Sequence, residues 1–264
     1  EAGNTGSPDD HNWTIDITDP VTTISSGPDD PSNSQSAIFQ FSSNEDSTFQ
    51  CQFDSGGWSS CSSPKSYSSL SESTHSFQVK ATDEANNTGS PDYHNWTIDI
   101  TDPVATISSG PSNLTNSQSA TFQFSSNEDD STFQCSMDTG SWSSCSSPKL
   151  YSSLSEGTHS FQVKATDEAN NTGSSDYHNW TIDITDPVTT INSNPANHTN
   201  SPNASFSFSS NEQGSTFECS LGSNNWTSCS SPVSYYNLSE GSHLFEVRAI
   251  DEANNTGNAS EFNW

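Results

Sequence analysis

One acidic, asparagine-rich segment is repeated along the chain. Asp-Glu-Ala-Asn-Asn-Thr-Gly occurs at Asp83–Gly89, Asp167–Gly173 and Asp251–Gly257, and a decayed copy opens the chain at Glu1–Gly6. Its residues suit two kinds of chemistry. Carboxylate and amide oxygens are ligands that Ca²⁺ takes, and Asn-Asn-Thr is an acceptor sequence for N-glycosylation. A third interpretation is a loop that was copied together with its domain.

The copies lie 84 residues apart, and nearly all of the remaining sequence repeats with them. Such a period indicates a tandem array. We predict domains at 19–101, 102–185 and 186–264, the last with a truncated final strand, after a segment 1–18 that matches the last strand of a preceding repeat. The sequence has no initiator Met, signal peptide or membrane-spanning stretch, so we expect a window from a longer protein. Alternatively, Thr14–Thr18 completes the last domain of a neighbouring subunit.

Each repeat is poor in hydrophobic residues and carries two cysteines. Only 27% of all residues are hydrophobic, and domains of this size are marginal on their own. A disulfide would compensate by about 2–3 kcal/mol and would indicate an extracytoplasmic setting. Free thiols or metal ligands are the alternative, although two cysteines are too few for a closed zinc site. The pairs that the repeat predicts are Cys51–Cys61, Cys135–Cys145 and Cys219–Cys229.

The charge is strongly acidic, with 33 Asp and Glu against 5 Lys and Arg, a net charge of −28. Phosphate binding needs clustered basic residues, so the charge excludes nucleic acid as a partner. It also disfavours insertion into, or binding to, an anionic membrane. A field of this sign keeps a long array soluble or attracts cations.

Alternating apolar residues predict an all-β fold, and no window has a sustained helical period. Seven short strands with frequent turns suggest a two-sheet sandwich. Trp142 is expected to pack in the core, close to the disulfide hairpin. The other tryptophans are also expected to lie in the core. In the middle repeat we expect strands at 104–108, 120–126, 132–137, 141–146, 149–154, 159–166 and 177–185.

Strand order should bring the acidic segments of each repeat to one pole. The loops at 127–130 and 167–171 would meet the preceding Thr-Ile-Asp-Ile strand and Thr-Asp-Pro linker there. Massed carboxylates repel one another unless a cation lies between them, so we expect Ca²⁺ at the domain junctions. Solvated loops are the alternative, because no EF-hand spacing fixes the ligands and Gln213 replaces one acid. The expected ligands are Asp16, Asp19, Glu45, Asp46, Asp83 and Glu84 at the first junction, Asp99, Asp102, Glu128, Asp129, Asp130, Asp167 and Glu168 at the second, and Asp183, Asp186, Glu212, Asp251 and Glu252 at the third.

Two further kinds of site can be assessed from the sequence. The glycosylation acceptor pattern occurs only slightly more often than this composition gives by chance. Catalysis has little support, because no Gly-x-Ser-x-Gly or phosphate-binding glycine loop is present. The candidate acceptors are Asn12, Asn86, Asn95, Asn113, Asn170, Asn179, Asn197, Asn203, Asn225, Asn237, Asn254 and Asn258.

The repeated pattern F-x-F-S … F-x-C-x-D/L … W-x-x-C-S-S-P … L-x-x-G-x-H-x-F-x-V-x-A-x-D spans all three repeats. It resembles the bacterial and archaeal Ig-like, fibronectin-III-like repeats of large surface and secreted proteins. The resemblance implies an Ig-like sandwich, a bridge of the Cys51–Cys61 type, and a stalk or adhesion role on the cell exterior. The acidic loop of such repeats is usually D-x-x-G-N, and Asn87, Asn171 and Asn255 stand here where glycine is common.

The leading interpretation is a non-catalytic extracellular structural segment, the stalk or body of a surface filament or giant adhesin. Its partners would be neighbouring repeats and other copies in a filament. A multivalent module for carbohydrate or another cell surface is the alternative, since display in many copies raises avidity. The spacer of a secreted hydrolase is a third interpretation. A fold of this kind does not by itself fix a ligand.

Overall fold

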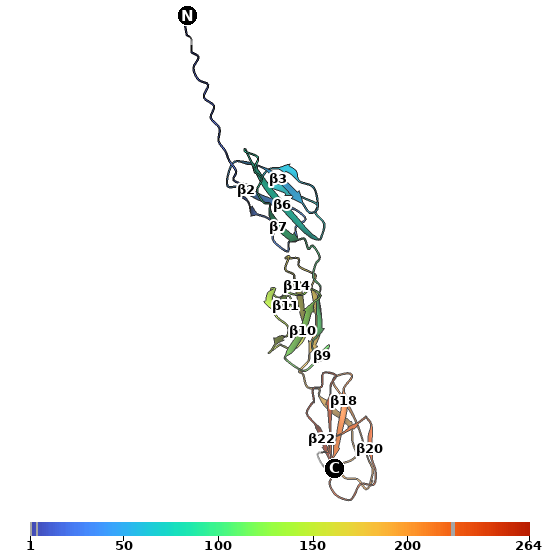
Figure 1. Cartoon of the computed structure of the whole chain (residues 1–264). Coiled ribbons are helices and arrows are strands. Elements are labelled where there is room, and N and C mark those ends of the chain that lie inside the picture. Colours follow the sequence, from blue (N-terminus) through green and yellow to red (C-terminus); the bar gives the residue numbers. More distant parts are fainter. Residues whose placement is uncertain (1, 4, 223–224) are drawn as a thin grey trace. The chain divides into compact units, whose positions relative to one another are not determined.

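The structure is a computed structural model that describes residues 2–3, 5–222 and 225–264. Within these ranges the regular secondary structure consists of β-strands, without helices (Figure 1). The same ranges contain no helix long and apolar enough to cross a membrane. Within the predicted segment 1–18, Glu1 and Asn4 lie outside the described residues. Contacts divide the chain into two compact units, Glu1–Pro103 with Thr166–Thr172, and Val104–Ala165 with Gly173–Trp264.

The first repeat is a sandwich of two antiparallel sheets with strand orders β1-β2-β5 and β4-β3-β6-β7. An immunoglobulin constant domain keeps its fourth strand in the sheet of the first, second and fifth strands. Here β4 pairs with β3 instead, which is the fibronectin-III arrangement. The strands are β1 (Thr22–Ser26), β2 (Ala37–Ser43), β3 (Ser47–Phe53), β4 (Ser59–Cys61), β5 (Lys65–Tyr67), β6 (Thr74–Asp83) and β7 (Asp92–Thr97).

The second and third repeats have the same two sheets. The second repeat adds a short strand, β9, which pairs in parallel with the end of β15. Its strands are β8 (Ala105–Ser109), β9 (Leu114–Thr115), β10 (Ala120–Ser126), β11 (Thr132–Met137), β12 (Ser143–Cys145), β13 (Lys149–Tyr151), β14 (Gly157–Thr166) and β15 (Asp176–Ile182). The third repeat has β16 (Thr189–Ser193), β17 (Ala204–Ser210), β18 (Thr216–Leu221), β19 (Thr227–Cys229), β20 (Val233–Tyr235), β21 (Leu244–Ile250) and β22 (Ser260–Asn263).

Each repeat has its own aromatic core between the two sheets. A phenylalanine from the second strand stacks on one from the sixth strand, and the tryptophan of the seventh strand packs against this pair. The ring centroids of the stacked pairs are 4.1 Å apart for Phe39–Phe77, 4.0 Å for Phe122–Phe161 and 4.0 Å for Phe206–Phe245. Because equivalent alternating positions supply these rings in all three repeats, the three cores are built in the same way.

The predicted strands of the middle repeat are confirmed with modest changes of length. Those at 120–126 and 132–137 have the predicted bounds, whereas 141–146 and 149–154 shrink to three residues each. Strand β9 was not predicted, because a two-residue strand has no alternation to detect. The strand expected at 177–185 ends at Ile182, and Ile184 is 40% exposed because the chain leaves the sheet there.

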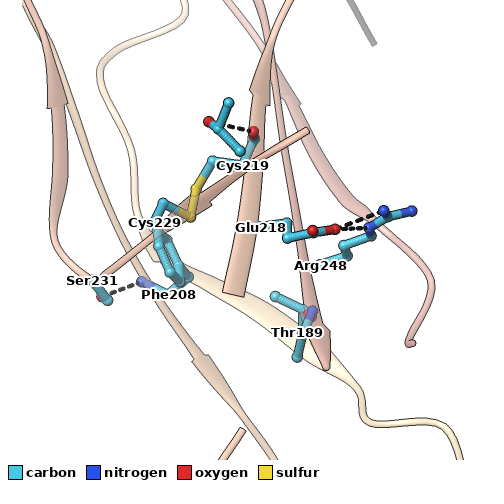
Figure 2. Close-up of a disulfide and its surroundings, with 9 residues drawn as sticks. Thr189, Phe208, Glu218, Cys219, Cys229, Ser231 and Arg248 are labelled. Carbon is cyan, nitrogen blue, oxygen red and sulfur yellow. Dashed lines mark hydrogen bonds and ion pairs between the residues drawn. A yellow bond between two sulfur atoms is a disulfide. The ribbon is translucent and has the colours of Figure 1, made fainter. Parts of the chain in front are cut away.

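The three predicted disulfides are present, each joining the third and fourth strands of its repeat. Figure 2 shows the bridge between Cys219 on β18 and Cys229 on β19. Close to it, the amide of Phe208 donates a hydrogen bond to Ser231 Oγ at 2.8 Å. The same bond to the second serine of Cys-Ser-Ser-Pro recurs in the other repeats. The motif therefore ties the disulfide hairpin to the opposite sheet.

The expectation that all tryptophans lie in the core is wrong for one column. Trp96 and Trp180 are buried, but Trp142 is 37% exposed, and its equivalents Trp58 and Trp226 are only half-buried. These three lie in the hairpin before the fourth strand, outside the sandwich, and a cation covers each ring. The pairs are Lys80 over Trp58, Lys164 over Trp142 and Arg248 over Trp226, at 4.5, 4.7 and 4.3 Å from the ring centroids.

The N-terminal segment forms no strand among its described residues before β1. Trp13, Ile15 and Ile17 repeat residues of the seventh strand and its continuation, yet they are 77%, 78% and 84% exposed. A β-strand needs a neighbouring strand for its backbone hydrogen bonds, and the described residues of 1–18 pair with no strand.

Candidate metal sites at the acidic turns

The repeated acidic segment folds as a tight turn at the end of the sixth strand. In the first repeat, the amide of Asn87 donates to Asp83 Oδ1 at 2.8 Å, and Asn87 Nδ2 donates to Asp83 Oδ2 at the same distance. The amide of Asn86 donates to the Asp83 carbonyl at 3.3 Å. The aspartate thus organises the loop through both carboxylate oxygens, each of which keeps a second lone pair for another partner.

The residue that replaces a glycine in this turn is the first asparagine of each pair. Asn86, Asn170 and Asn254 have φ values of 68°, 69° and 71°, the left-handed region that Asn tolerates better than most residues. The expectation that Asn87 and its equivalents occupy the glycine position is therefore wrong by one residue. The turn is tight without glycine, because asparagine supplies the required conformation.

The second asparagine has a different role, because its side chain holds the incoming linker. Asn87 Nδ2 donates to the carbonyl oxygen of Asp16 at 3.1 Å, and Asn255 Nδ2 donates to that of Asp183 at 2.8 Å. Each of these donors also binds the aspartate of its own turn, Asp83 or Asp251. One amide group therefore ties the preceding strand to the acidic turn.

The glycine that ends the segment makes room for the Thr-Asp-Pro linker. A Cβ on Gly89 would lie 1.9 Å from the carbonyl oxygen of Pro20, and one on Gly257 would lie 1.9 Å from that of Pro187. Contacts that short are impossible, so any side chain here would push the linker away. The second asparagine and the glycine of the repeated segment thus both serve to join one repeat to the chain before it.

This arrangement brings three carboxylates together in each compact unit. We call these sets the carboxylate triads: Asp16, Glu45 and Asp83 in the first unit, and Asp183, Glu212 and Asp251 in the second. In each triad one oxygen from every residue lies within 4.8 Å of the other two. The aspartate from the turn is buried in both. The linker, the loop between the second and third strands, and the acidic turn contribute one carboxylate each.

The other expected ligands are not members of these two triads. Asp46 and Glu84 are exposed but line the same hollow as the first triad. Asp19, Asp186 and Glu252 are exposed. In the first unit, Asp99 is half-buried and Asp167 is buried. Asn171 Nδ2 donates to the backbone carbonyl oxygen of Asp99 at 2.9 Å and to Asp167 Oδ2 at 2.8 Å. The remaining residues of that set are half-buried Glu128 and exposed Asp102, Asp129, Asp130 and Glu168.

Electrostatic repulsion is visible within both triads. Partial burial and the charges of Asp16 and Asp83 raise the pKa of Glu45 above its ordinary value. Partial burial, followed by Asp183, Asp251 and more distant carboxylates, raises the pKa of Glu212 in the same way. All five Lys and Arg side chains of the protein stack on aromatic rings. Each of these five side chains therefore lies over a ring, and Arg248 also forms an ion pair with Glu218.

The triads fit a hard cation in their ligand type and spacing. Calcium takes six to eight oxygen ligands at about 2.3–2.6 Å, so two ligands on opposite sides of the ion lie about 5 Å apart. The 4.8 Å limit within each triad agrees with that spacing. Three carboxylates supply part of such a shell, and carbonyl oxygens and water can supply the rest. Softer metals would favour nitrogen or sulfur ligands.

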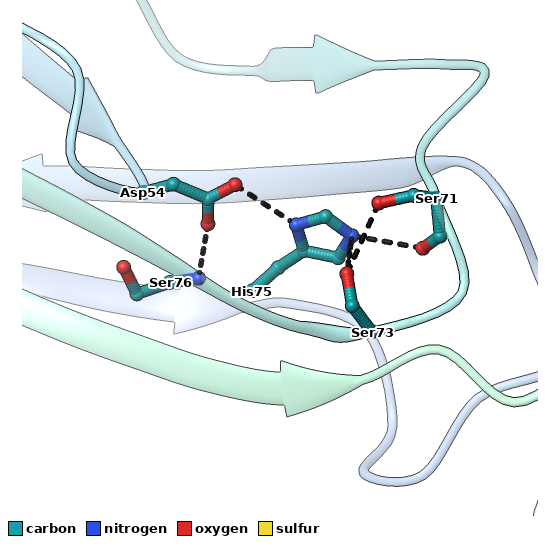
Figure 3. Close-up of polar contacts among 5 residues, drawn as sticks. All are labelled: Asp54, Ser71, Ser73, His75 and Ser76. Carbon is teal, nitrogen blue, oxygen red and sulfur yellow. Dashed lines mark hydrogen bonds and ion pairs between the residues drawn. The ribbon is translucent and has the colours of Figure 1, made fainter.

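A histidine and an aspartate also meet, in a position that no sequence pattern predicts. Figure 3 shows His75 Nδ1 at 3.0 Å from Asp54 Oδ2, and His75 Nε2 at 2.9 Å from the Ser71 carbonyl and 3.4 Å from Ser73 Oγ. Burial alone lowers the pKa of His75, but the hydrogen bonds to Asp54 and Ser71 and the charge of Asp54 raise it overall. The turns that bring them together place the pair at the opposite end of β6 from Asp83.

This group resembles a Ser-His-Asp triad in composition but not in geometry. Nδ1 faces Asp54 Oδ2, and Nε2 lies closer to the Ser71 carbonyl oxygen (2.9 Å) than to Ser73 Oγ (3.4 Å), so Nε2 is poorly placed to take a proton from Ser73. The second repeat keeps the pair as His159 and Asp138, 2.8 Å apart, but has Gly157 at the position of the serine. The histidine therefore ties the loop before the sixth strand to the loop after the third.

The candidate glycosylation acceptors share one property: all twelve are exposed. In the Asn-Asn-Thr segments the acceptor is Asn86, Asn170 or Asn254, whereas the neighbouring asparagine is turned inward to hold the linker. The two asparagines of each segment thus have separate surroundings. A glycan on the first would leave intact the hydrogen bonds of the second to its own turn and to the preceding segment, which we call the asparagine clamp.

Comparisons with known proteins found structural likenesses but no match to any family model or curated protein. The fibronectin(III)-like modules of Clostridium thermocellum CbhA share 13% identity over 61% of this chain and 94% of theirs, with a TM-score of 0.40. A 1.5-MDa bacterial ice-binding adhesin shares 10% identity over 94% of this chain and 98% of that chain, with a TM-score of 0.41. A tetra-tandem repeat from the extending region of a large adhesion protein shares 16% sequence identity over 93% of this chain and 73% of that chain, with a TM-score of 0.30.

The strand order defines the class of protein. Three sandwiches, each with sheets of the first, second and fifth strands and of the fourth, third, sixth and seventh strands, follow one another along the chain. The protein is a tandem array of fibronectin-III-like β-sandwich repeats.

Proposed function

We propose that this chain is a structural segment of an extracellular array, a stalk or the body of a filament or giant adhesin, whose acidic turns bind Ca²⁺. The observation that carries the proposal is the carboxylate triad, built by the same three elements in both compact units. A repeated site at the join between a linker and its repeat suits a mechanical role, since every copy would be stiffened in the same way.

The extracellular setting is supported by the covalent chemistry of the chain. Every cysteine is in a disulfide, and disulfides persist in oxidising compartments. The acceptor asparagines are all exposed, as glycosylation requires. The net charge of −28 would keep a long array soluble through self-repulsion.

Calcium would act on the linker. In each triad one carboxylate, Asp16 or Asp183, belongs to the linker, and two belong to the repeat that follows. Without a cation these charges repel, and the hydrogen bonds of Asn87 and Asn255 to the linker oppose that repulsion. A bound ion would turn the repulsion into attraction and restrict the linker. By sequence, Asp99, Glu128 and Asp167 are the equivalent residues of the middle repeat.

A binding role for the exposed tryptophans has less support. Flat aromatic rings that stack on sugars must be open, whereas Trp58, Trp142 and Trp226 each lie beneath a cation. The exposed Tyr93 and Tyr177 have no counterpart in the third repeat, where Glu261 stands at that position. Multivalent recognition through one repeated aromatic face is therefore not the function that we propose.

Calcium is expected to raise the unfolding temperature of the chain at neutral pH. A site saturated about 100-fold above its dissociation constant stabilises the folded state by about 2.7 kcal/mol, which corresponds to roughly 10–20 °C for a domain of this size. Glu212→Gln should remove most of the shift in the third repeat. Glu240→Gln makes the same change of charge outside the triads and should keep the shift. Differential scanning calorimetry in calcium and in EDTA measures both.

The effect of calcium should also depend on pH. The pKa of Glu212 is raised in the folded state, so its repulsion with neighbouring carboxylates opposes folding at neutral pH and is relieved as the pH falls through that pKa. Protons then compete with calcium, and the calcium-dependent shift should shrink at mildly acidic pH. An equal shift in wild type and Glu212→Gln, or no shift at all, would contradict calcium binding at this triad.

A further inference from the structure

The linker that leads into the third repeat is fixed at both ends by hydrogen bonds of its backbone. The amide of Asp183 donates to the Thr115 carbonyl oxygen of the second repeat at 3.0 Å. The amide of Val188 donates to Asn211 Oδ1 of the third repeat at 2.6 Å. Only residues 184–187 lie between these two anchors, so the course of the linker depends on what holds this short span.

Thr185 lies within that span and forms hydrogen bonds in two directions. Its amide donates to Asp183 Oδ1 at 3.0 Å, and its hydroxyl donates to Glu156 Oε1 at 2.8 Å. Glu156 directly precedes β14, so it belongs to the body of the second repeat and not to the linker. Thr185 therefore connects a loop of the second repeat to the carboxylate that the linker contributes to the triad.

The hydrogen bonds continue from Asp183 into the third repeat through the asparagine clamp. Asn255 Nδ2 donates to the Asp183 carbonyl oxygen at 2.8 Å and to Asp251 Oδ2 at 2.7 Å. Asp251 is buried and belongs to the triad. One continuous series of hydrogen bonds thus runs from Glu156 in the second repeat to the acidic turn of the third.

The same series recurs in the first compact unit. Thr101 Oγ1 donates to Glu72 Oε1 at 2.6 Å, and the amide of Thr101 donates to Asp99 Oδ1 at 3.0 Å. Asn171 Nδ2 donates to the Asp99 carbonyl oxygen at 2.9 Å and to Asp167 Oδ2 at 2.8 Å. Two linkers make the same four bonds, so the arrangement belongs to the repeated sequence.

We propose that Thr185 and Glu156 are positioning residues that hold the carboxylate of Asp183 in its triad. We call this pair the linker latch. Asp183 is the one member of the triad that precedes the third repeat, so its place depends on the linker. A hydroxyl has a single hydrogen to donate, and Glu156 offers it a charged acceptor, which makes the stronger kind of hydrogen bond. Thr101 and Glu72 form the equivalent latch in the first unit.

Glu156 acts through Thr185 and is not a member of the triad. It nevertheless lies near the site, because the pKa of Glu212 is raised first by partial burial and then by four carboxylates, of which Glu156 has the smallest effect. A ligand and a positioning residue differ in one testable property. A calcium ligand needs its negative charge, whereas the acceptor of a hydroxyl needs only an oxygen atom.

The test is amide NMR of the 264-residue chain with the variant Thr185→Val, which replaces the hydroxyl with a methyl group of similar size. In EDTA we expect the order parameter of the Thr185 amide to be about 0.85 in the wild type, as in rigid backbone, and about 0.6 in the variant. In a calcium titration followed at Asn255, the variant should bind about tenfold more weakly, the lower end of what a lost supporting hydrogen bond costs a metal site. The second expectation rests on the proposed calcium site, and the first does not.

Three further variants make the result specific. Glu156→Gln keeps an acceptor oxygen without the charge, so it should stay close to wild type in both measurements, whereas Glu156→Ala should behave like Thr185→Val. Thr190→Val makes the same change as Thr185→Val at an exposed position of β16 and should leave both measurements unchanged.

Two results would overturn the linker latch. One is a Thr185→Val chain with the order parameters of the wild type in EDTA. The other is a Glu156→Gln chain that matches Glu156→Ala, because the charge of Glu156 would then be the property that matters. A wild type that does not respond to calcium would contradict the proposed function alone, and the order parameters in EDTA would still decide for or against the latch.

Discussion

Replacing Phe122 with alanine is expected to lower the free energy of unfolding of the middle repeat by about 3–5 kcal/mol. Its ring is fully buried and stacks on Phe161 at 4.0 Å, with Trp180 at 5.2 Å and Tyr151 at 6.3 Å. The substitution leaves a cavity between the two sheets that neither sheet can close, because both are held by the surrounding aromatic residues. Scanning calorimetry should show one repeat unfolding at a clearly lower temperature than the other two.

The matched control is Thr121→Ala on the same strand. Thr121 is exposed on the opposite face of β10, so its replacement should change the free energy of unfolding by no more than about 0.5 kcal/mol. If Phe122→Ala left the transition of the middle repeat unchanged, the aromatic stack would not be the core of the sandwich.

Removing one disulfide is expected to have the second largest effect. The double variant Cys135→Ala with Cys145→Ala opens a loop with a sequence separation of 10. The loop-closure entropy then returned to the unfolded chain lowers stability by about 2–3 kcal/mol. Cys135 is buried, so the loss of its packing adds to this effect. Urea unfolding should show the middle repeat unfolding at a lower concentration of denaturant than the other two.

Reduction of the wild type provides the control for that variant. A thiol reductant should destabilise all three repeats of the wild type by similar amounts, since each has an equivalent bridge. It should not further destabilise the middle repeat of the double variant. If the unfolding curves of the variant and the wild type overlay, the bridge contributes nothing to the folded state.

The sequence predicted the core well because the core obeys a simple alternation. Phe122 and Phe124, Phe161 and Val163, and Trp180 and Ile182 are all buried as their period of two indicates. The disulfides followed from the repeat alone. Strand alternation and repetition are local or one-dimensional properties, and a single sequence displays both of them fully.

The predictions that were wrong or incomplete concern side chains whose contacts are made by other segments of the chain. Trp142 lies on no long strand, and its contact with Lys164 depends on the way the hairpin folds over β14. The different roles of Asn86 and Asn87 depend on a φ angle and on the linker carbonyl of Asp16. Of the six carboxylates expected at the first junction, three converge closely, and which three do so is set by the loop conformations rather than by spacing.

The pairing of His75 with Asp54 is a further case. The residues are 21 positions apart, Asp54 in the turn after β3 and His75 near the start of β6, and they show no pattern of spacing. A comparison among the repeats could have drawn attention to it, because the first two repeats keep both residues and the third has Gly222 in place of the aspartate. That pattern is typical of a local structural pair, and the contacts of the two imidazole nitrogens agree with it.

The measurement that tests the account most directly is small-angle X-ray scattering of the 264-residue chain in calcium and in EDTA. Profiles extrapolated to zero protein concentration report on single chains. The account predicts a stiff, extended particle in calcium and a more flexible one with a broader distance distribution in EDTA, because the carboxylates of the linkers repel those of the repeats once the ion is removed. Identical profiles under the two conditions would contradict it. The acidic turns would then hold the linker through the asparagine clamp and contribute charge for solubility, without binding calcium.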